Sequence, residues 1–224
     1  MIEYYNEDCM EGMKRYGDKH FDLCICDPPY GLGECQKKVN QRSRKTDKWK
    51  NASAPQYGGG NWDNVKPPDE YFSEIKRVSI NQIIWGANHF GKMAPSSGWV
   101  VWYKKRFDEV NDFSDAELAY TSFNKGVRLF HFPWIGFGAV NAKEHRIHPT
   151  QKPVKLYKWL LHNYAKQGDL ILDTHVGSAS SLIACYDMGF DAVGFELDKD
   201  YYKASKKRLN DFMAQGKLFK EDTE

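Results

Sequence analysis

Four consecutive residues, Asp27-Pro28-Pro29-Tyr30, carry groups that could hold a planar amine. Neither proline donates an N–H, and each restrains the preceding residue to extended geometry, so the carbonyls of Asp27 and Pro28 stay free to accept hydrogen bonds. Asp27 adds an ionised acceptor and Tyr30 adds an aromatic face. Acceptors around one point under a ring suit the exocyclic amine of a nucleobase. The alternative is a proline turn with a solvent-facing aspartate.

A second group of residues suggests a nucleoside site. Asp173 ends the apolar segment 170–173 and precedes a turn of small residues that opens an expected helix at 180–188. Such a turn lets a ligand approach the N–H groups of the helix start. Glu196 follows Gly177 by about twenty residues, the distance at which an acid commonly binds ribose hydroxyls. The single glycine argues against pyrophosphate and NAD, and the alternative is an ordinary strand–helix connection.

A third signal is the hexapeptide His148-Pro149-Thr150-Gln151-Lys152-Pro153, which comes just before another expected helix. Side chains at a helix start, here Thr150 and Lys152, could hold the carboxylate of a ligand. In the alternative, Thr150 only caps the helix and Lys152 is solvated.

The elements that must position these residues alternate along the chain. Strands are expected at 2–5, 21–26, 82–85, 99–103, 115–120, 128–132, 170–172 and 192–195, the fifth and sixth as a hairpin-like return. Helices are expected at 9–16, from 67 onward, at 150–165, at 180–188 and at 199–213, the last ending near Gly216. This order predicts a doubly wound α/β sheet, whose ligands collect at the carboxyl ends of the strands. Five polar residues should meet there: Asp8, Asp27, Asn88, Asp173 and Glu196.

Length and composition favour one folded domain. The 224 residues, 41% of them hydrophobic, fit a single domain over residues 1–224 with a substantial core. Because the chain has neither a long apolar run nor a signal-like N-terminus, we expect an intracellular protein without membrane association. The five cysteines are too scattered for a disulfide framework or a zinc site, and we expect no metal.

Charge is unevenly distributed although the net charge is only +2. The irregular, basic stretch 31–66 is the kind of segment that contacts phosphates, and the loop 132–147 is a second candidate for nucleic-acid recognition. The candidate contacts of the first loop are Lys37, Lys38, Arg42, Arg44, Lys45, Lys48 and Trp49. The alternative for this segment is a solvated, disordered loop.

The order of the three signals resembles the β group of amino-directed DNA methyltransferases, in which the catalytic half precedes the cofactor half, and is most similar to small phage and prophage adenine methylases. The likeness covers about residues 5–208 and extends to Gly86-Ala87-Asn88, Trp99-Val100-Val101-Trp102 and Phe113-Ser114-Asp115-Ala116-Glu117-Leu118. It implies a seven-stranded, mostly parallel, Rossmann-like methyltransferase sheet with the N-terminal strand beside the C-terminal pair. It also implies the cytoplasm of a prokaryotic or phage-infected cell and an enzyme of restriction–modification type.

The resemblance implies roles for the quoted residues. Asp27 and the Pro28 carbonyl would orient the target amine, with Pro29 completing the tetrapeptide, and Tyr30 would stack on a base swung out of the duplex. The cofactor would be S-adenosylmethionine, with Asp8 at its adenine, Glu196 at its ribose, Thr150 and Lys152 at its methionine end, and Asp27, Asp173, Thr174, His175, Gly177 and Ser178 around it. The turn departs from the usual family pattern at His175 and Ala179. Binding is still expected, because Asp173, Gly177 and Glu196 remain.

The expected reaction is methyl transfer to N6 of adenine in double-stranded DNA, achieved by positioning and polarisation rather than by a metal. Asp27 acts as an acceptor and need not be a strong base. N4-cytosine methylation is one alternative, although related cytosine enzymes often carry Ser where Asp27 stands. An RNA methyltransferase and a non-catalytic nucleic-acid-binding module are the others. A homodimer is a candidate assembly.

Overall fold

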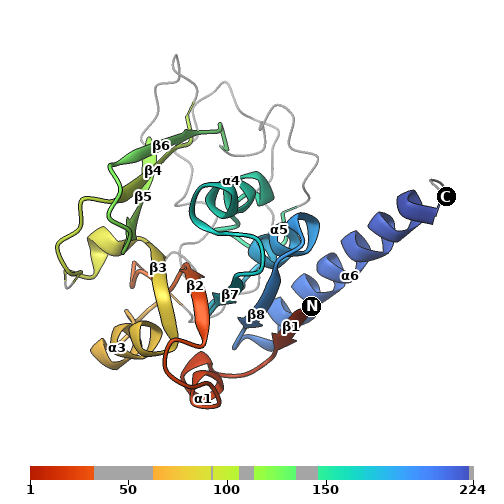
Figure 1. Ribbon diagram of the computed structural model, residues 1–224, viewed down its shortest axis with the longest axis horizontal. Coiled ribbons are helices and arrows are strands. Elements are labelled where there is room, and N and C mark those ends of the chain that lie inside the picture. The colour runs from red at the N-terminus through yellow and green to blue at the C-terminus, as the bar shows by residue number, and fades with distance from the viewer. Residues whose placement is uncertain (33–62, 92, 106–113, 135–145, 222–224) are drawn as a thin grey trace, which may run out of the picture.

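The structure is a computed structural model that describes residues 1–32, 63–91, 93–105, 114–134 and 146–221 (Figure 1). Its described strands form one sheet in the order β1-β8-β7-β2-β3-β5-β4-β6. The strands are β1 (Ile2–Tyr5), β2 (Phe21–Cys26), β3 (Ser79–Trp85), β4 (Trp99–Tyr103), β5 (Ala116–Thr121), β6 (Arg128–His131), β7 (Leu170–Asp173) and β8 (Asp191–Phe195). The predicted α/β, mostly parallel sheet is confirmed, and so is the place of β1 at the edge, next to the pair β8 and β7. Within the described ranges the sheet has eight strands, so the expected number of seven is wrong.

The eighth strand comes from the region predicted to form a hairpin-like return. β5 and β6 do not pair with each other, because β4 lies between them, antiparallel to β5 and parallel to β6. The chain leaving β5 passes closely over Gly98, where an added Cβ would lie 2.6 Å from the Phe123 carbonyl oxygen. The missing side chain of Gly98 therefore makes room for the connection from β5 to β6, which lies at the edge of the sheet beside β4.

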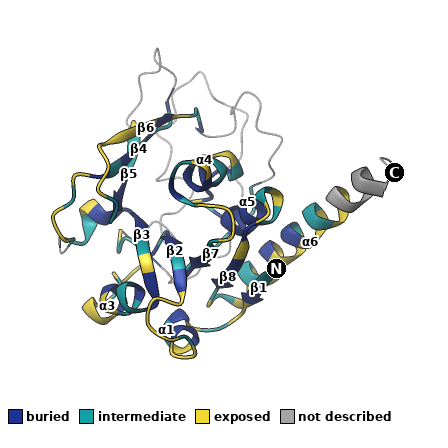
Figure 2. Cartoon of the chain, viewed as in Figure 1, coloured by how far each residue is buried: buried dark blue, intermediate teal, exposed yellow. Residues whose placement is uncertain are grey.

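The helices cover both faces of the sheet (Figures 1 and 2). They are α1 (Cys9–Met13), α3 (Asp69–Val78), α4 (Val154–Tyr164), α5 (Ser180–Met188) and α6 (Lys199–Glu221), with a short 3-10 turn, η2 (Ala87–His89). The helix expected to end near Gly216 continues to Glu221, since a glycine inside a helix costs only about 1 kcal/mol relative to alanine and does not by itself end the helix.

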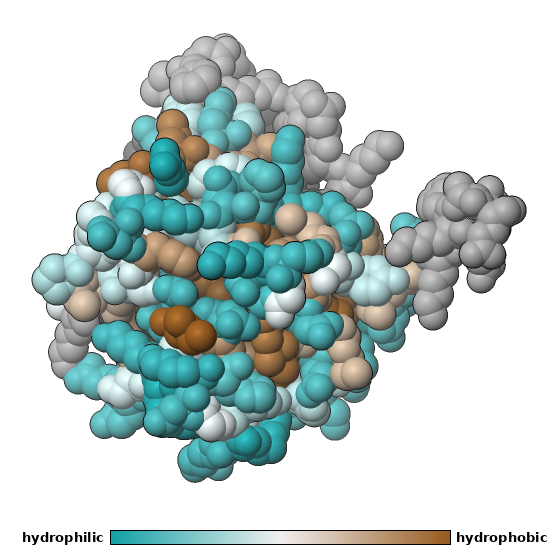
Figure 3. All heavy atoms as spheres, viewed as in Figure 1, coloured by the Kyte–Doolittle hydropathy of each residue, from teal (hydrophilic) through white to brown (hydrophobic). Residues whose placement is uncertain are grey.

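Two apolar clusters hold the layers together, one on each face of the sheet. Neighbouring residues of β3 divide between them, because successive strand side chains point to opposite faces. Ile83 and Trp85 pack with α4 and α5, whereas Ile84 packs with α1 and α3. The molecular face in Figure 3 is largely hydrophilic, with apolar side chains in small patches. Among the described residues, no helix has both the length and the apolar character needed to cross a membrane.

The reversal of winding occurs between β2 and β7, which are parallel neighbours. From this point β3 continues to one side and β8 and β1 to the other. The carboxyl ends of these five parallel strands share one edge of the sheet, and a ligand site is expected outside that edge. Asp27 follows β2 directly and Asp173 ends β7, so two carboxylates stand at the switch point.

Candidate active site

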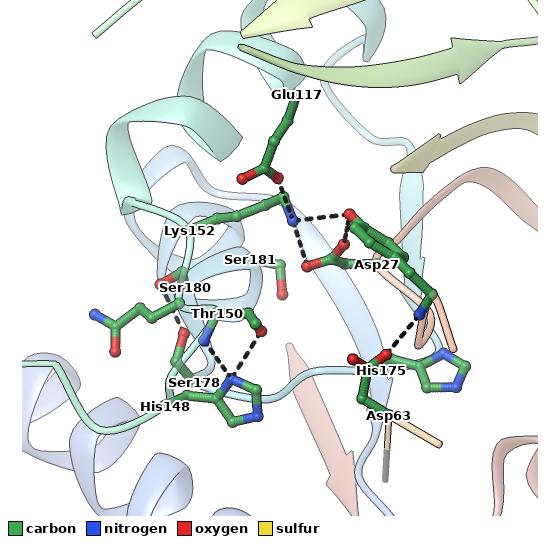
Figure 4. A network of polar contacts seen from close by, with 12 residues as sticks. Asp27, Asp63, Glu117, His148, Thr150, Lys152, His175, Ser178, Ser180 and Ser181 are labelled. Carbon is green, nitrogen blue, oxygen red and sulfur yellow. Dashed lines mark hydrogen bonds and ion pairs between the residues drawn. The ribbon is translucent and has the colours of Figure 1, made fainter. Parts of the chain in front are cut away.

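Asp27 lies in a polar cluster instead of facing solvent. Its side chain is 17% exposed, and its Oδ2 accepts a hydrogen bond from Lys152 Nζ at 2.5 Å (Figure 4). The hydroxyl of Tyr30 donates to the other oxygen, Oδ1, at 2.7 Å. The alternative of a solvent-facing aspartate after a proline turn is therefore wrong.

Lys152 is the buried centre of this cluster, with only 3% of its side chain exposed. Its ammonium also lies 3.1 Å from Glu117 Oε2 and 3.3 Å from the Tyr30 hydroxyl oxygen, and 5.3 Å from the centre of the Trp85 ring. Burial alone lowers the pKa of a lysine, but the carboxylates of Asp27 and Glu117 outweigh it and raise the pKa of Lys152. The alternative of a solvated Lys152 is wrong.

Glu117, on β5, completes the cluster. Its Oε1 accepts a hydrogen bond from Lys104 Nζ at 2.8 Å, and a quarter of its side chain is exposed. Burial opposes ionisation of this carboxyl, yet Lys152 and Lys104 lower the pKa of Glu117 to about 2. Both carboxylates that contact Lys152 thus belong to ion pairs.

Backbone contacts hold Tyr30 in place. The N–H groups of Tyr30 and Gly31 donate to Asp63 Oδ1 at 2.9 and 3.0 Å. The Tyr30 ring is stacked on His89 of η2, with ring centres 5.1 Å apart and planes 20° apart. Its edge fits against Gly86, where an added Cβ would lie 2.1 Å from Tyr30 Cε1 and where φ is +66°. Gly86 is therefore required both by the backbone and by the ring.

The turn after β7 is organised by its two acids. Asp173 is 2% exposed and accepts hydrogen bonds from the His175 N–H at 2.9 Å and from the Ser181 hydroxyl. Burial raises the pKa of Asp173 to about 7. Glu196 accepts from the Gly177 N–H at 2.8 Å, and burial raises the pKa of Glu196 as well. These bonds fix a turn in which Gly177 has a φ of +54°.

His175 and Ala179, the two residues at which the turn departs from the usual family pattern, are accommodated within it. The Nδ1 of His175 lies 3.0 Å from Thr174 Oγ1, which in turn lies 2.6 Å from the Tyr71 hydroxyl. Burial lowers the pKa of His175 to about 4, so the ring is neutral at pH 7 and packs edge-on against Tyr71. Ala179 is fully buried with a φ of +62°, at the N-cap position of α5. His175 thus supplies an uncharged ring at this position.

The hexapeptide adjoins the glycine turn. The His148 ring lies 3.9 Å from the position of a Cβ added to Gly177, and the hydroxyl of Thr150 lies 3.1 Å from His148 Nδ1. Pro153, and not Thr150, occupies the N-cap position of α4, and no side chain caps that helix. The alternative role of Thr150 as the helix cap is therefore wrong. Residues 148–152 instead reach from the turn to Asp27.

Most of the polar residues expected at the strand ends meet there. Asp27 and Glu196 lie close enough to Asp173 for their charges to add to the effect of burial in raising the pKa of that residue. Asp8 caps α1 by accepting from the Met10 N–H at 2.7 Å. Asn88 is exposed on η2. Ser178 is buried, and its hydroxyl oxygen lies 3.0 Å from that of Ser180.

The candidate nucleic-acid contacts of the first loop, Lys37, Lys38, Arg42, Arg44, Lys45, Lys48 and Trp49, lie outside the described residues. Of the loop 132–147, the structure describes residues 132–134 and 146–147. Here the Arg146 guanidinium lies 4.8 Å from the centre of the Trp134 ring, whose N–H donates to the Gln151 carbonyl.

Asp63 and Glu117 are not among the site residues that the sequence predicts. Asp63 belongs to the irregular stretch 31–66, where no periodicity singles it out. Glu117 stands in the segment 113–118 that was part of the family resemblance, and this was the available signal for it. From distant parts of the chain, Asp63 accepts from the Tyr30 N–H and Glu117 contacts Lys152.

The parallel sheet, with a cluster of carboxylates beside a glycine turn at its switch point, is the arrangement of a methyltransferase. A family model described as DNA methylase matches residues 102–207. The type II methyltransferase M.HpaI of Haemophilus parainfluenzae is 34% identical, over 91% of this chain and 72% of that protein. The putative methylase YubD of Escherichia coli K12 is 24% identical, over 93% and 90%.

Solved structures show the same fold. The M1.HpyAVI–SAM complex superposes with a TM-score of 0.55 at 20% identity, covering 93% of this chain and all of that one. The cytosine-N4-specific PvuII DNA methyltransferase gives 0.55 at 14% identity, over 94% and 90%. The chain belongs to the N6/N4 DNA methylase family. It is an S-adenosylmethionine-dependent DNA amino-methyltransferase, acting on adenine N6 or cytosine N4.

Proposed function

We propose that this enzyme methylates N6 of adenine in double-stranded DNA. The observation that carries the proposal is the carboxylate of Asp27, which follows β2 at the switch point and is held there by Lys152 and Tyr30. Each of its oxygens has a lone-pair position that neither neighbour uses, which supports the acceptance of an amino group beside Lys152. Asp27, at the position where related cytosine enzymes often carry Ser, favours adenine over cytosine.

S-adenosylmethionine fits the carboxyl edge of the sheet. Its sulfonium charge would be favoured near Asp27, Asp173 and Glu196, whose carboxyls gather there. Leu197, 69% exposed beside Glu196, offers apolar surface for a purine ring next to an acceptor for ribose hydroxyls. An added Cβ on Gly177 would meet nothing closer than 3.9 Å, so the turn has room for a ligand.

We assign the remaining cofactor contacts to Asp8, Thr150 and the turn residues Thr174, His175, Gly177 and Ser178. Lys152, expected at the methionine end, has its ammonium in contact with Asp27, Glu117 and Tyr30 instead. The cofactor supplies an activated methyl group, so the protein must position and polarise the amine. Asp27 and the Pro28 carbonyl accept the N–H bonds of that amine, which directs its lone pair toward the methyl group. The Tyr30 ring packs against the extruded base.

A proton must leave the amine once the methyl group has been transferred, because the methylated nitrogen is then cationic and acidic. The carboxylate of Asp27 can receive it without being a strong base. The loops 31–66 and 132–147 would carry the DNA contacts, and a homodimer is the proposed assembly.

The test is product analysis. Purified enzyme is incubated with unmethylated DNA and S-adenosylmethionine, and the hydrolysed nucleosides are separated by mass. We expect N6-methyladenine and no product from the Asp27→Ala variant. A product containing only N4-methylcytosine would refute the adenine assignment, and RNA offered side by side tests the alternative nucleic acid. Sequencing of DNA from expressing cells then gives the recognition site.

A further inference from the structure

Glu117 is an ionised side chain of the active-site cluster for which the proposed reaction so far has no role. It lies on β5, opposite Trp102 of β4, and its two oxygens contact two different lysines. One of these, Lys152, joins it to Asp27, while the other, Lys104, follows β4. Lys152 therefore connects Glu117 to Asp27, the residue proposed to receive the target amine (Figure 4).

The position of the Lys152 ammonium depends on both carboxylates that it contacts, those of Asp27 and Glu117. Its ammonium has three N–H donors, and the structure provides three oxygens for them, on Asp27, Glu117 and Tyr30. Loss of the Glu117 oxygen leaves one donor of a buried ammonium without its acceptor, and the group must tilt to find another. Such a tilt changes which oxygen of Asp27 is occupied, and with it the direction in which Asp27 receives an amine.

The charges of the cluster cancel. Asp27 and Glu117 are two carboxylates, and Lys152 and Lys104 are two ammonium groups in contact with them. During methyl transfer the positive charge moves from the sulfonium to the amine beside Asp27. If Glu117 were neutral, an unbalanced cation would stand next to the nitrogen that becomes positive, which disfavours the transition state.

We propose that Glu117 is a positioning residue for methyl transfer: it holds Lys152 in place, so that Asp27 keeps its orientation and the cluster keeps zero net charge. This inference rests on the proposed amine methylation. It predicts that the charge of Glu117, and not only its shape, sets the rate of the reaction.

The test compares Glu117→Gln with a matched control, Asp115→Asn. Asp115 lies two residues before Glu117 and pairs with Lys105, whereas the carboxylates at Lys152 are those of Asp27 and Glu117. Its variant therefore removes a neighbouring carboxylate–lysine pair and leaves the contacts of Lys152 in place. Methyl transfer is measured with saturating DNA and cofactor, cofactor affinity by calorimetry, and folding by the thermal midpoint.

We expect Glu117→Gln to slow transfer by about tenfold to a hundredfold, the effect of one lost charge-assisted hydrogen bond, with a smaller change in cofactor affinity. The alkaline limb of its pH–rate profile should move to lower pH, because Lys152 has lost one of the two carboxylates that keep it protonated. Glu117→Asp, which keeps the charge, should recover part of the rate. The methyl-transfer rate and the pH–rate profile of Asp115→Asn should match those of the wild type.

The outcomes separate the two proposals. A wild-type enzyme that methylates no amino group in DNA refutes the proposed function itself. An active wild type with an equally active Glu117→Gln variant and an unchanged pH profile overturns the role of Glu117 alone. A rate loss that follows only the loss of thermal stability, with no shift of the alkaline limb, also overturns it.

Discussion

Replacing Lys152 with methionine tests the polar cluster most directly. The variant keeps the length and apolar stem of the side chain but leaves the carboxylates of Asp27 and Glu117 without their shared cation. Removing one partner of a buried ion pair typically costs about 3–5 kcal/mol. Since the two carboxylates are 17% and 25% exposed, we expect the lower end, about 3 kcal/mol, for Lys152→Met. For a chain of this size that corresponds to a fall in Tm of about 6–12 °C.

The pH dependence of this loss identifies its cause. Although burial opposes it, the lysines lower the pKa of Glu117 from its ordinary 4.5 to about 2. A lowered pKa contributes stability above the ordinary value and loses it as the pH falls through about 2. The Tm difference between wild type and Lys152→Met should therefore be complete above about pH 5 and shrink as the pH approaches 2.

Thermal unfolding followed by circular dichroism over this pH range measures both effects. Lys155→Met serves as the control, because Lys155 is exposed on α4 and lies 5.0 Å from the Phe132 ring, away from the cluster. A Lys152→Met protein whose Tm at pH 7 lies within about 2 °C of the wild type would refute the reasoning, since a shift that small corresponds to at most about 1 kcal/mol.

Three further predictions concern substrate and cofactor. Asp27→Ala should abolish methyl transfer while calorimetry shows cofactor affinity largely unchanged; normal turnover would remove Asp27 from the mechanism. Tyr30→Ala should weaken the hold on the extruded base by about 1–3 kcal/mol, seen as reduced affinity for DNA with an abasic partner opposite the target, whereas Tyr30→Phe should have a mild effect. Joint replacement of Arg42, Arg44 and Lys45 by glutamine should lower DNA affinity and flatten its salt dependence, measured by fluorescence anisotropy at several salt concentrations; an unchanged slope would leave these cations without a role in binding.

The sequence predicted the parts of the fold that local patterns determine. The apolar run 21–26 formed β2, and the helix at 180–188 ended at Gly189, whose φ is +75°. The partners of β5 and β6 could not be predicted in this way, because local patterns do not tell which strands become neighbours across the sheet. The close passage over Gly98 that sends β6 past β4 involves residues more than twenty positions apart.

The candidate site shows the same division. The tetrapeptide was visible because its chemistry is contained in four neighbouring residues, Asp27-Pro28-Pro29-Tyr30. Its supports were not, because each comes from a distant strand or loop: Asp63 binds the Tyr30 and Gly31 N–H groups, and Lys152 reaches Asp27 from the hexapeptide. Long-range pairs of opposite charge leave no local periodicity, so only the folded chain reveals them.

The contact between Lys152 and Asp27 raises the question of how an amine can bind to an oxygen that an ammonium already contacts. A carboxylate has about four lone-pair positions on its two oxygens. Among the described residues, Tyr30 occupies one on Oδ1 and Lys152 occupies one on Oδ2. A position therefore remains on each oxygen, and the target amine can be accepted while Lys152 stays in place. Because the amine is neutral and the ammonium is not, the ion pair is the stronger contact and should persist when DNA binds. Lys152 then acts as a fixed part of the pocket and not as a group that the substrate must displace.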